Sequence, residues 1–331
     1  MNSFGRIFRV NVFGESHGES VGVNIDGIPA GIPLKQEDFL PDLERRKAGA
    51  KGTTPRKEED LPFLKSGVFN DHTTGAPITI LFENNNTRSA DYAKLREFPR
   101  PGHADFVATR KYGGFEDYRG GGHFSGRLTL NLVAAGVIAK KILGSNIQVK
   151  AVLKEVGGFA DAEQGLESAI AAKDSVGGIV ECTVDGLPIG LGEPFFDSIE
   201  SNIAHAVFAI PAIKGIEFGA GFAAAKMKGL EHNDAILDKS GKTATNNAGG
   251  VVGGISNGNQ LVFRIAVKPT SSTPKVQETL NVASGQVEQF SVKGRHDLCI
   301  ALRVPVVLEA VTAMVLADFM LLEMQAPRVW K

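Results

Sequence analysis

The chain has 331 residues, of which 43% are hydrophobic and 22% are charged. These proportions exclude the disordered, collagen-like and coiled-coil classes of protein. The formal net charge is -1, so a local group of cations, rather than the field of the whole molecule, must attract any anionic partner. Glycine is unusually frequent. It accounts for 39 of the 331 residues, which is more than the usual share of about 7%. This excess indicates that backbone lines a functional surface.

Alternation of apolar and polar residues predicts three half-buried strands. They cover residues 8–12, 147–153 and 261–267. A strand of this kind has one face on a core and one face toward water, which is typical of antiparallel sheets.

Apolar residues at helical spacing predict three helices. The first is capped by Ser125 and ends at Gly144, and the second runs from Ser198 until Pro211. The third covers residues 305–324 and is apolar on nearly every side, so it should be covered on more than one face. Helices packed between antiparallel sheets satisfy both patterns. The sequence therefore predicts an α+β fold, a β-α-β sandwich.

Residues 23–32 and 182–191 share Asp, Gly, Pro and Gly at matching places. A duplication explains this likeness, and so does chance or a common turn after a strand. No Ser-, Pro- or Gln-rich linker divides the chain. We therefore expect one domain over residues 1–331, with two similar halves at about 1–150 and 151–331.

Cysteine usage and apolar runs predict the compartment. Cys182 and Cys299 form no Cys-x-x-C pair, so we expect no zinc site, at most one disulfide and a cytoplasmic location. Mostly apolar stretches such as residues 132–139 and 310–317 fall far short of the roughly 20 residues that span a bilayer. Arg6, among other charges, interrupts what would be the apolar part of a secretory signal. We expect neither a membrane segment nor a leader.

Two loop segments each present a histidine next to glycine. Residues 14–18 (Gly-Glu-Ser-His-Gly) follow the first strand, and residues 100–105 (Arg-Pro-Gly-His-Ala-Asp) place His103 between an arginine and an aspartate. A histidine side chain titrates near neutral pH and suits general acid catalysis. Each segment also fits an ordinary turn with a locally bonded histidine.

Two further segments of the first half suit anions. Residues 45–57 carry six lysines and arginines, which fit a solvated helix end or a clamp for phosphate or carboxylate. Residues 118–127 bring three consecutive glycines to the helix capped by Ser125, which predicts an anion site at a helix N-terminus, or else a surface loop. Neither the P-loop spacing nor Gly-x-Gly-x-x-Gly is present, so ATPase and Rossmann interpretations fail.

The second half adds segments around its strand at 261–267. Residues 246–258 contain two Gly-Gly pairs, and residues 268–272 read Lys-Pro-Thr-Ser-Ser. Together they fit a flat, phosphorylated cofactor, although glycine-rich turns explain them too. Asp297 ends the segment 293–297, Lys-Gly-Arg-His-Asp, and suits a base or a salt-bridge partner.

These segments resemble, in order, the signatures of the chorismate synthase family, and the likeness extends from residue 4 to about 325. The segments that carry it are residues 14–18, 100–105, 119–127, 253–258, 268–272 and 294–297. The resemblance implies a β-α-β sandwich and a homotetramer. It implies a lyase that converts 5-enolpyruvylshikimate 3-phosphate to chorismate and phosphate by anti-1,4-elimination, the seventh step of the shikimate pathway to aromatic amino acids. It also implies reduced FMN as cofactor, without net redox change.

The resemblance further implies roles for single residues. His17 corresponds to the acid near the leaving phosphate, His103 to the acid that protonates the reduced flavin, and Asp297 to the residue assisting deprotonation beside flavin N5. The implied substrate-binding residues are Arg46, Arg100 and Arg127. The implied flavin-binding residues are Ser125, Pro211, Ala212, Gly253, Lys268, Pro269, Thr270, Ser271, Ser272 and Arg295.

The sequence departs from the family pattern in places. Gly52 stands where an arginine is usual, with Lys51 beside it as a poor geometric substitute, and His123 and Phe124 replace Arg and Ser. Flavin and substrate affinity are expected to respond to these changes. The short chain, without an extra insertion, favours an external flavin reductase, so that NADPH acts only indirectly.

Two other functions remain open at this point. A nucleic-acid-binding protein would use the run at 45–57, but the near-neutral charge and the lack of aromatic residues near that run disfavour it. A flavin-dependent oxidoreductase would consume NAD(P)H stoichiometrically.

Overall fold

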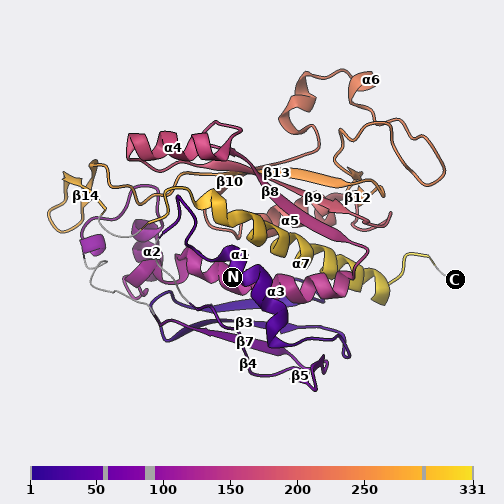
Figure 1. Ribbon diagram of the computed structural model, residues 1–331, viewed down its shortest axis with the longest axis horizontal. Helices are drawn as coiled ribbons and strands as arrows, with labels where there is room; N and C mark the ends of the chain where they lie inside the picture. The colour runs from indigo at the N-terminus through magenta and orange to yellow at the C-terminus, as the bar shows by residue number, and fades with distance from the viewer. Residues whose placement is uncertain (1, 55–58, 86–93, 293–295, 330–331) are drawn as a thin grey trace.

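The computed structural model describes residues 2–54, 59–85, 94–292 and 296–329. It consists of two antiparallel sheets with helices between them (Figure 1). The first sheet has the strand order β1-β2-β3-β7-β4 and the second has the order β10-β13-β9-β8. The predicted α+β sandwich is confirmed.

The first sheet is formed by residues from the N-terminal quarter of the chain. Its strands are β1 (Ser3–Phe4), β2 (Arg9–Gly14), β3 (Ser20–Asp26), β4 (Phe63–Leu64) and β7 (Ile78–Glu83). The strands of the second sheet are β8 (Gln148–Val156), β9 (Gly178–Asp185), β10 (Ile213–Phe218) and β13 (Leu261–Val267). Three small hairpins pair β5 (Val68–Phe69) with β6 (His72–Thr73), β11 (Val251–Val252) with β12 (Ile255–Ser256), and β14 (Gln277–Asn281) with β15 (Gln286–Phe290).

Seven α-helices and several 3-10 turns occur in the described part of the chain. The α-helices are α1 (Leu40–Arg46), α2 (Asp105–Tyr112), α3 (Thr129–Leu143), α4 (Ala162–Ala172), α5 (Ile199–Val207), α6 (Gly229–His232) and α7 (Val304–Gln325). The 3-10 turns are η1 (Gln36–Phe39), η3 (Arg119–Phe124), η4 (Gly126–Leu128), η5 (Phe195–Asp197), η6 (Gly221–Lys226) and η7 (Ile300–Arg303).

The three predicted strands and three predicted helices are all present, with boundaries shifted by a few residues. β13 buries every second residue, as its alternation predicts. Ser125 accepts a hydrogen bond from the Arg127 amide at the start of η4, directly before α3. Ser198 caps α5 in the same way through the Ser201 amide. The alternation of apolar residues and the capping serines therefore predicted the positions of these elements correctly.

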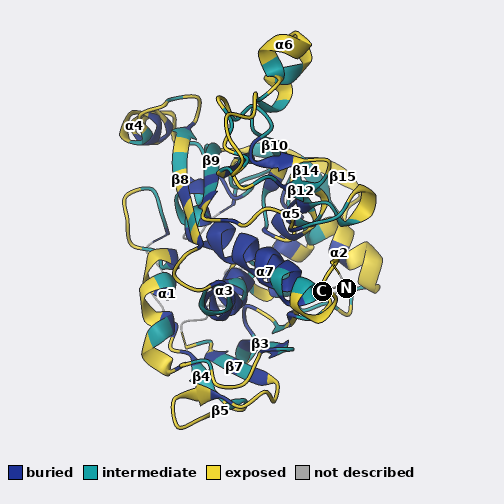
Figure 2. Cartoon of the chain, turned by 90° about the vertical axis from the view of Figure 1, so that its right-hand side faces the viewer, coloured by how far each residue is buried: buried dark blue, intermediate teal, exposed yellow. Residues whose placement is uncertain are grey.

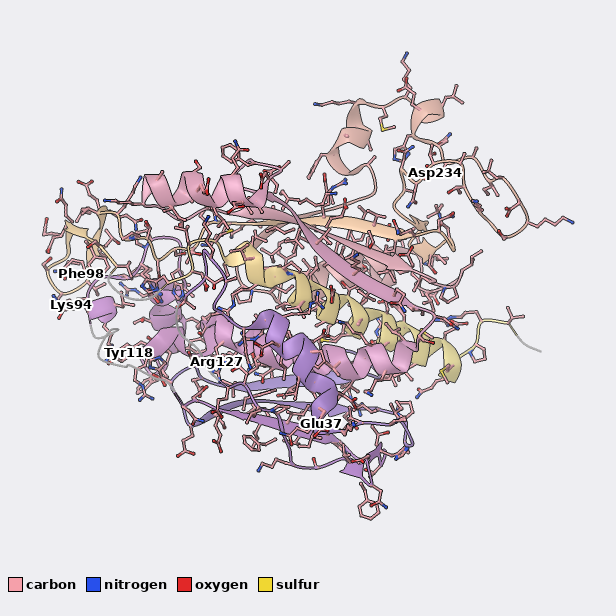
Figure 3. The ribbon with its side chains drawn as sticks, in the orientation of Figure 1. Glu37, Lys94, Phe98, Tyr118, Arg127 and Asp234 are labelled. Atoms are coloured by element: carbon pink, nitrogen blue, oxygen red, sulfur yellow. The ribbon has the colours of Figure 1, made fainter. Side chains whose placement is uncertain are left out.

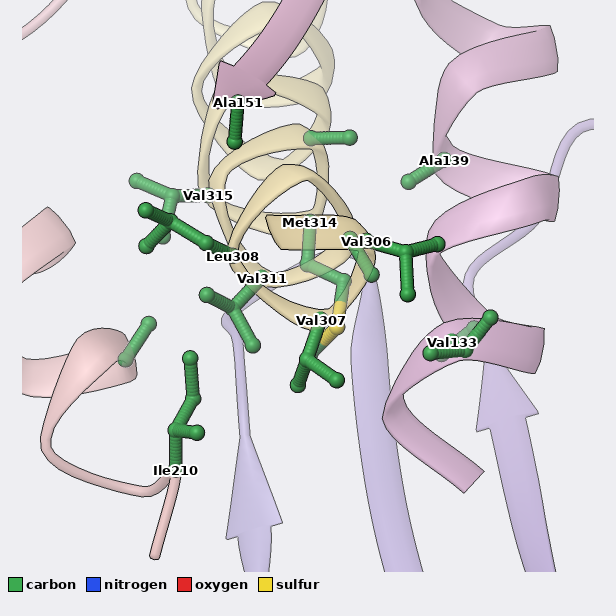
Figure 4. Packing of buried hydrophobic residues seen from close by; sticks show 14 of the residues in the cluster. Val133, Ala139, Ala151, Ile210, Val306, Val307, Leu308, Val311, Met314 and Val315 are labelled. Atoms are coloured by element: carbon green, nitrogen blue, oxygen red, sulfur yellow. The ribbon is translucent and has the colours of Figure 1, made fainter. Parts of the chain in front are cut away.

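The middle layer consists of α3 and α7, which lie side by side between the sheets (Figure 2). Valine, leucine and methionine side chains of α7 meet apolar residues of α3, β8 and the segment after α5 (Figure 4). The two helices approach closely at Gly136, where an added Cβ would lie 2.5 Å from the Ala310 Cα. Glycine at this position is therefore required for the packing of the central layer.

The helix that includes α7 is long and apolar enough to cross a membrane by length and composition alone. The candidate stretch is Ile300–Gln325, and 78% of its most apolar window is buried inside the protein. The helices α3 and α5 and the strands β8 and β9 of the second sheet cover it, as expected from its lack of a polar face. Cys182 and Cys299 are also buried, and both are free thiols.

The two segments that resemble each other occupy similar places in the two sheets. Residues 23–26 end β3, which pairs with β2, and residues 182–185 end β9, which pairs with β8. Each segment then leaves its sheet through an Asp-Gly step. The duplication into halves of about 1–150 and 151–331 stays a prediction.

Candidate active site

A cavity of about 910 Å³ lies between the two sheets, at the end where α1, α3 and α7 begin or end. All three predicted catalytic side chains, His17, His103 and Asp297, line it. The predicted substrate-binding residues Arg46, Arg100 and Arg127 line the same cavity, and Figure 3 shows Arg127 at the beginning of α3. Six residues from five separate parts of the sequence thus line one cavity.

Most of the predicted flavin-binding residues also reach this cavity. Those that line it are Ser125, Pro211, Ala212, Lys268, Thr270, Ser271 and Ser272. Pro269 does not line it, and Gly253 lies in the hairpin of β11 and β12, where an added Cβ would meet no atom within 4 Å. Arg295 lies outside the described residues.

His17 lies in the turn between β2 and β3 and is 7% exposed. The glycine run packs directly on it: an added Cβ at Gly120, whose φ is +61°, would lie 2.5 Å from His17 Nε2. The Ser16 amide donates to the Gly122 carbonyl, and His123 Nδ1 lies 2.8 Å from the Gly14 carbonyl oxygen. The glycine run is thereby fastened to the loop of His17 instead of forming a loose surface loop.

His103 belongs to a charged cluster at the start of α2. Its Nδ1 lies 2.6 Å from Asp105 Oδ1, and Arg100 donates to both carboxylate oxygens of Asp105, at 2.7 and 2.8 Å. Burial favours the neutral acid, yet the hydrogen bonds and charges of Arg100 and His103 hold the pKa of Asp105 well below its usual range. An ionised Asp105 therefore fixes the orientation of both side chains.

Arg100 makes more hydrogen bonds within the protein than is expected of an arginine that is kept available for an anionic ligand. Besides the two bonds to Asp105, it donates to the Ser272 hydroxyl at 3.1 Å. Much of the donor capacity of this guanidinium is used within the protein. Arg100 links the loop of His103 to the segment 268–272 of the second half.

Arg46 and Arg127 share one buried carboxylate. Arg46 Nη2 donates to Asp60 Oδ2 at 2.8 Å, and Arg127 Nη1 donates to Asp60 Oδ1 at 2.7 Å. Asn84 and the Glu83 carbonyl hold the other side of Arg127. Burial disfavours the charged form of Asp60, but the two guanidinium groups keep the pKa of Asp60 below its ordinary value.

Asp297 sits just before η7 and is held from two sides. The Thr54 amide donates to its Oδ1 at 2.8 Å, and Arg303 Nη1 donates to its Oδ2 at 3.3 Å. Arg303 also donates to the Arg46 carbonyl at 2.9 Å. Asp297 is thus placed as a charge-paired carboxylate on the wall of the cavity.

The segment after β13 brings hydroxyl groups and a cation. Lys268 Nζ donates to the Ser271 hydroxyl at 2.8 Å, and that hydroxyl donates to the Gly102 carbonyl at 2.8 Å. Burial, and then the charge of Lys214, lower the pKa of Lys268. The buried Thr270 hydroxyl has no hydrogen-bond partner among the described residues, so it can bond to water or to a polar group of a ligand.

The lining carries a clear excess of positive charge. Its lysines and arginines are Arg46, Lys47, Arg100, Arg127, Lys268 and Arg303, and its carboxylates are Asp60 and Asp297. Arg46 Nε is buried and finds no partner within the described ranges. Such a wall suits a ligand with several negative charges. Within the part of the chain that the structure describes, no group of three His, Cys, Asp or Glu is placed to hold a metal ion.

The described cations of the run at 45–57 are paired with carboxylates. Arg45 binds Glu309, Lys47 binds Glu44, and Lys51 binds Glu163 and Glu167. These pairs leave little basic surface for nucleic acid. Arg56 and Lys57 lie outside the described residues.

The departures from the family pattern have distinct consequences. Lys51 does not line the cavity, and a Cβ at Gly52 would meet Leu166 and Leu302 side chains instead of the cavity. Lys51 therefore does not replace the missing arginine in this structure. His123 and Phe124, by contrast, both line the cavity.

Sequence reasoning missed Asp60, Arg303, His205 and Thr54, which also line the cavity. One signal was available for Arg303: a cation directly before a long helix opposes the helix dipole, so some other contact must hold it there. Asp60 follows two glutamates in a loop, where no local pattern distinguishes it.

The fold is of the α+β class, and the cation-rich cavity with its histidines is typical of an enzyme that acts on an anionic substrate. A family model described as chorismate synthase matches residues 8–321. A chorismate synthase from Chitinophaga pinensis is 88% identical over 331 residues, which is the whole of both chains. One from Lachnospira eligens is 46% identical over 352 aligned residues, with 98% of this chain and 96% of the relative covered.

A solved structure of a chorismate synthase has the same fold. It matches with a TM-score of 0.73 and 25% identity, and covers 97% of this chain and 93% of that chain. The chain belongs to the chorismate synthase family.

Proposed function

We propose that the protein converts 5-enolpyruvylshikimate 3-phosphate into chorismate and phosphate by anti-1,4-elimination, in the seventh step of the shikimate pathway. Family membership supports this reaction, and one observation carries it to the site: His17, His103 and Asp297 line one cation-rich cavity. The substrate carries two carboxylates and a phosphate. The excess of lysine and arginine offsets the cost of removing these anions from water.

In this proposal the arginines bind and the histidines move protons. Arg46 and Arg127 hold anionic groups of the substrate, and Arg100 fixes the loop of His103. His17, packed under the glycine run, protonates the departing phosphate oxygen as the C–O bond breaks. The charge-paired Asp297 assists removal of the hydrogen from C6. The apolar wall from α7, with Val307 and Val311, helps to exclude water.

The cavity also fits reduced FMN. Ala212 has a φ of +75°, its carbonyl accepts from the Lys268 amide, and together with Thr270, Ser271 and Ser272 it offers backbone and hydroxyl groups to a flat, phosphorylated ligand. Bound reduced FMN would supply electron density to the breaking C–O bond and recover it, so that no net oxidation occurs. His103 would hold the proton for the flavin, oriented by Asp105.

We also propose a homotetramer in the cytoplasm, with an external NADPH-dependent reductase for the flavin. Between residues 187 and 252, all of which are described, nine large apolar side chains are more than half exposed, on segments that include η5, η6 and α6. Figure 2 shows α6 as a largely exposed element at the edge of the molecule. They are Ile189, Phe195, Phe196, Phe208, Phe222, Leu230, Ile236, Leu237 and Val252. Apolar exposure on this scale is typical of an interface. Gly253 belongs to the same region and would reach a flavin only through a second copy.

The reaction is tested by anaerobic incubation of the purified protein with the substrate and FMN reduced by dithionite. Phosphate and chorismate are expected in equal amounts, and none with oxidised FMN. His17→Ala should reduce the rate by about 10²–10⁴-fold, the usual contribution of a general acid. No phosphate release by the wild-type protein would refute the proposal. In a parallel assay with NADPH in place of dithionite, one NADPH consumed per turnover would indicate an oxidoreductase.

A further inference from the structure

The carboxylate of Asp60 lies between Arg46 and Arg127, the two arginines that are proposed above to bind a substrate anion. Each oxygen accepts from a different arginine, at 2.8 and 2.7 Å. Asp60 is 5% exposed and lines the cavity itself. The geometry resembles that of a bound anion, because one acceptor group bridges two convergent guanidinium groups.

We propose that Asp60 is an internal competitor, which occupies the arginine pair in the free protein and is displaced when an anionic group of the substrate binds. This inference rests on the proposed function. A substrate oxygen cannot accept the hydrogen bonds that Arg46 Nη2 and Arg127 Nη1 donate while Asp60 accepts them. A carboxylate left beside the bound anion would also repel it across a dry cavity.

The backbone at Asp60 supports displacement. Its φ is +53°, in the left-handed region, which costs a residue with a side chain some strain, although less for aspartate than for most. The ion pairs with the two arginines hold it there, since residues 59–62 belong to no helix or strand. When another anion takes the arginines, the strain no longer has this compensation, and the carboxylate is free to leave.

The arginines themselves are arranged to accept a replacement. Arg127 is fixed by Asn84 at 2.6 Å and by the Glu83 carbonyl at 3.0 Å, independently of Asp60. Arg46 holds Asp60 through Nη2, while its buried Nε has no partner among the described residues. A phosphate or carboxylate that contacts both Nε and Nη2 of Arg46 would satisfy it better than Asp60 does.

The test measures binding of 5-enolpyruvylshikimate 3-phosphate, and separately of inorganic phosphate, to the full chain by isothermal titration calorimetry. Asp60→Asn removes the competing charge at nearly constant shape, and Asp60→Gly also removes the backbone strain. Both variants should bind the substrate about tenfold more tightly than the wild type. The melting temperature of each should rise more with added phosphate than that of the wild type.

Asp42→Asn is the matched control, because Asp42 also bridges two cations, Arg45 and Lys140, but lies outside the cavity. Its substrate affinity should equal that of the wild type. Unchanged or weaker substrate binding in the Asp60 variants overturns the inference and makes Asp60 a fixed support of the arginines. If one variant does not fold, the other decides. Failure of the wild-type protein to bind the substrate would instead count against the proposed function.

Discussion

Arg45 and Arg46 are neighbours at the end of α1, yet they lie in opposite environments. The Arg45 side chain is 46% exposed and donates two bonds of 2.7 Å to Glu309, a buried residue of α7. The Arg46 side chain is 4% exposed, lines the cavity and makes its ion pair through one nitrogen. The first arginine fastens two helices together, and the second faces the cavity.

The pKa shifts of the two arginines follow from this difference. The hydrogen bond to Glu309 raises the pKa of Arg45, although burial opposes it. Burial, and then the nearby charge of Arg303, lower the pKa of Arg46 to about 10. Arg46 therefore keeps its charge at neutral pH at an energetic cost, as expected of a cation that waits for an anionic ligand. A fully paired cation such as Arg45 is typical of a structural contact.

The largest expected effect is on activity. Arg46→Lys keeps the positive charge but loses the planar fork, so it cannot hold an anion through two parallel bonds. We expect kcat/KM to fall about 10³-fold, equivalent to about 4 kcal/mol of transition-state binding. Arg45→Lys should stay within about threefold of the wild type. Anaerobic phosphate release gives both values, and equal losses in the two variants would show that the environments do not separate their roles.

A smaller effect is expected on stability. Arg45→Gln leaves the carboxylate of Glu309 with Lys140, at 3.1 Å, as its remaining cation. The free energy of unfolding should fall by about 1–2 kcal/mol, a value reduced because Arg45 is itself partly exposed. Urea denaturation measures it, with Arg9→Gln as control, since Arg9 and its partner Asp26 are both exposed. A midpoint that moves equally in both variants would contradict the structural role of Arg45.

The same two arginines show what the sequence could and could not predict. Strands, caps and the apolar helix were predictable because alternation, Ser125 and Gly144 act within a few residues. Nothing local distinguishes Arg45 from Arg46, because their difference depends on Glu309 and Asp60, which other segments supply. The resemblance to the family singled out Arg46, and the fold supplies the physical reason, since Arg46 lines the cavity and Arg45 does not.

Most of the site residues could be predicted because several segments resemble one family in the same order. This joint likeness is far more specific than the likeness of any single segment. Asp60 and Thr54 lie outside these segments and were missed. Asp60 and Thr54 contact the predicted residues Arg46 and Asp297 from irregular loops, and such long-range pairing leaves no periodic trace. Gly253 was predicted from the family and does not reach the cavity within one chain.

The smallest expected effect is a pH dependence of stability at Glu309. Burial favours the neutral acid, but the bonds from Arg45 and the charge of Lys140 keep the pKa of Glu309 below its ordinary value of 4.5. A carboxyl group whose pKa is lowered in the folded state stabilises that state above the unfolded pKa, and this contribution is lost as the pH falls through the folded pKa. Glu309→Gln should therefore be less stable than the wild type by about 1 kcal/mol at pH 7.

The difference between Glu309→Gln and the wild type should shrink as the pH falls below the ordinary glutamate pKa of 4.5 and through the lower pKa of Glu309 in the folded state. Asp60 and Asp105 also lose stabilising ionisation in acid, but they do so equally in both proteins, so the comparison isolates Glu309. Glu44→Gln is the control, because Glu44 pairs with Lys47 and its side chain is 70% exposed. Urea midpoints between pH 3 and 7 give the curves. A difference that does not change with pH would mean that packing, and not the charge on Glu309, joins α1 to α7.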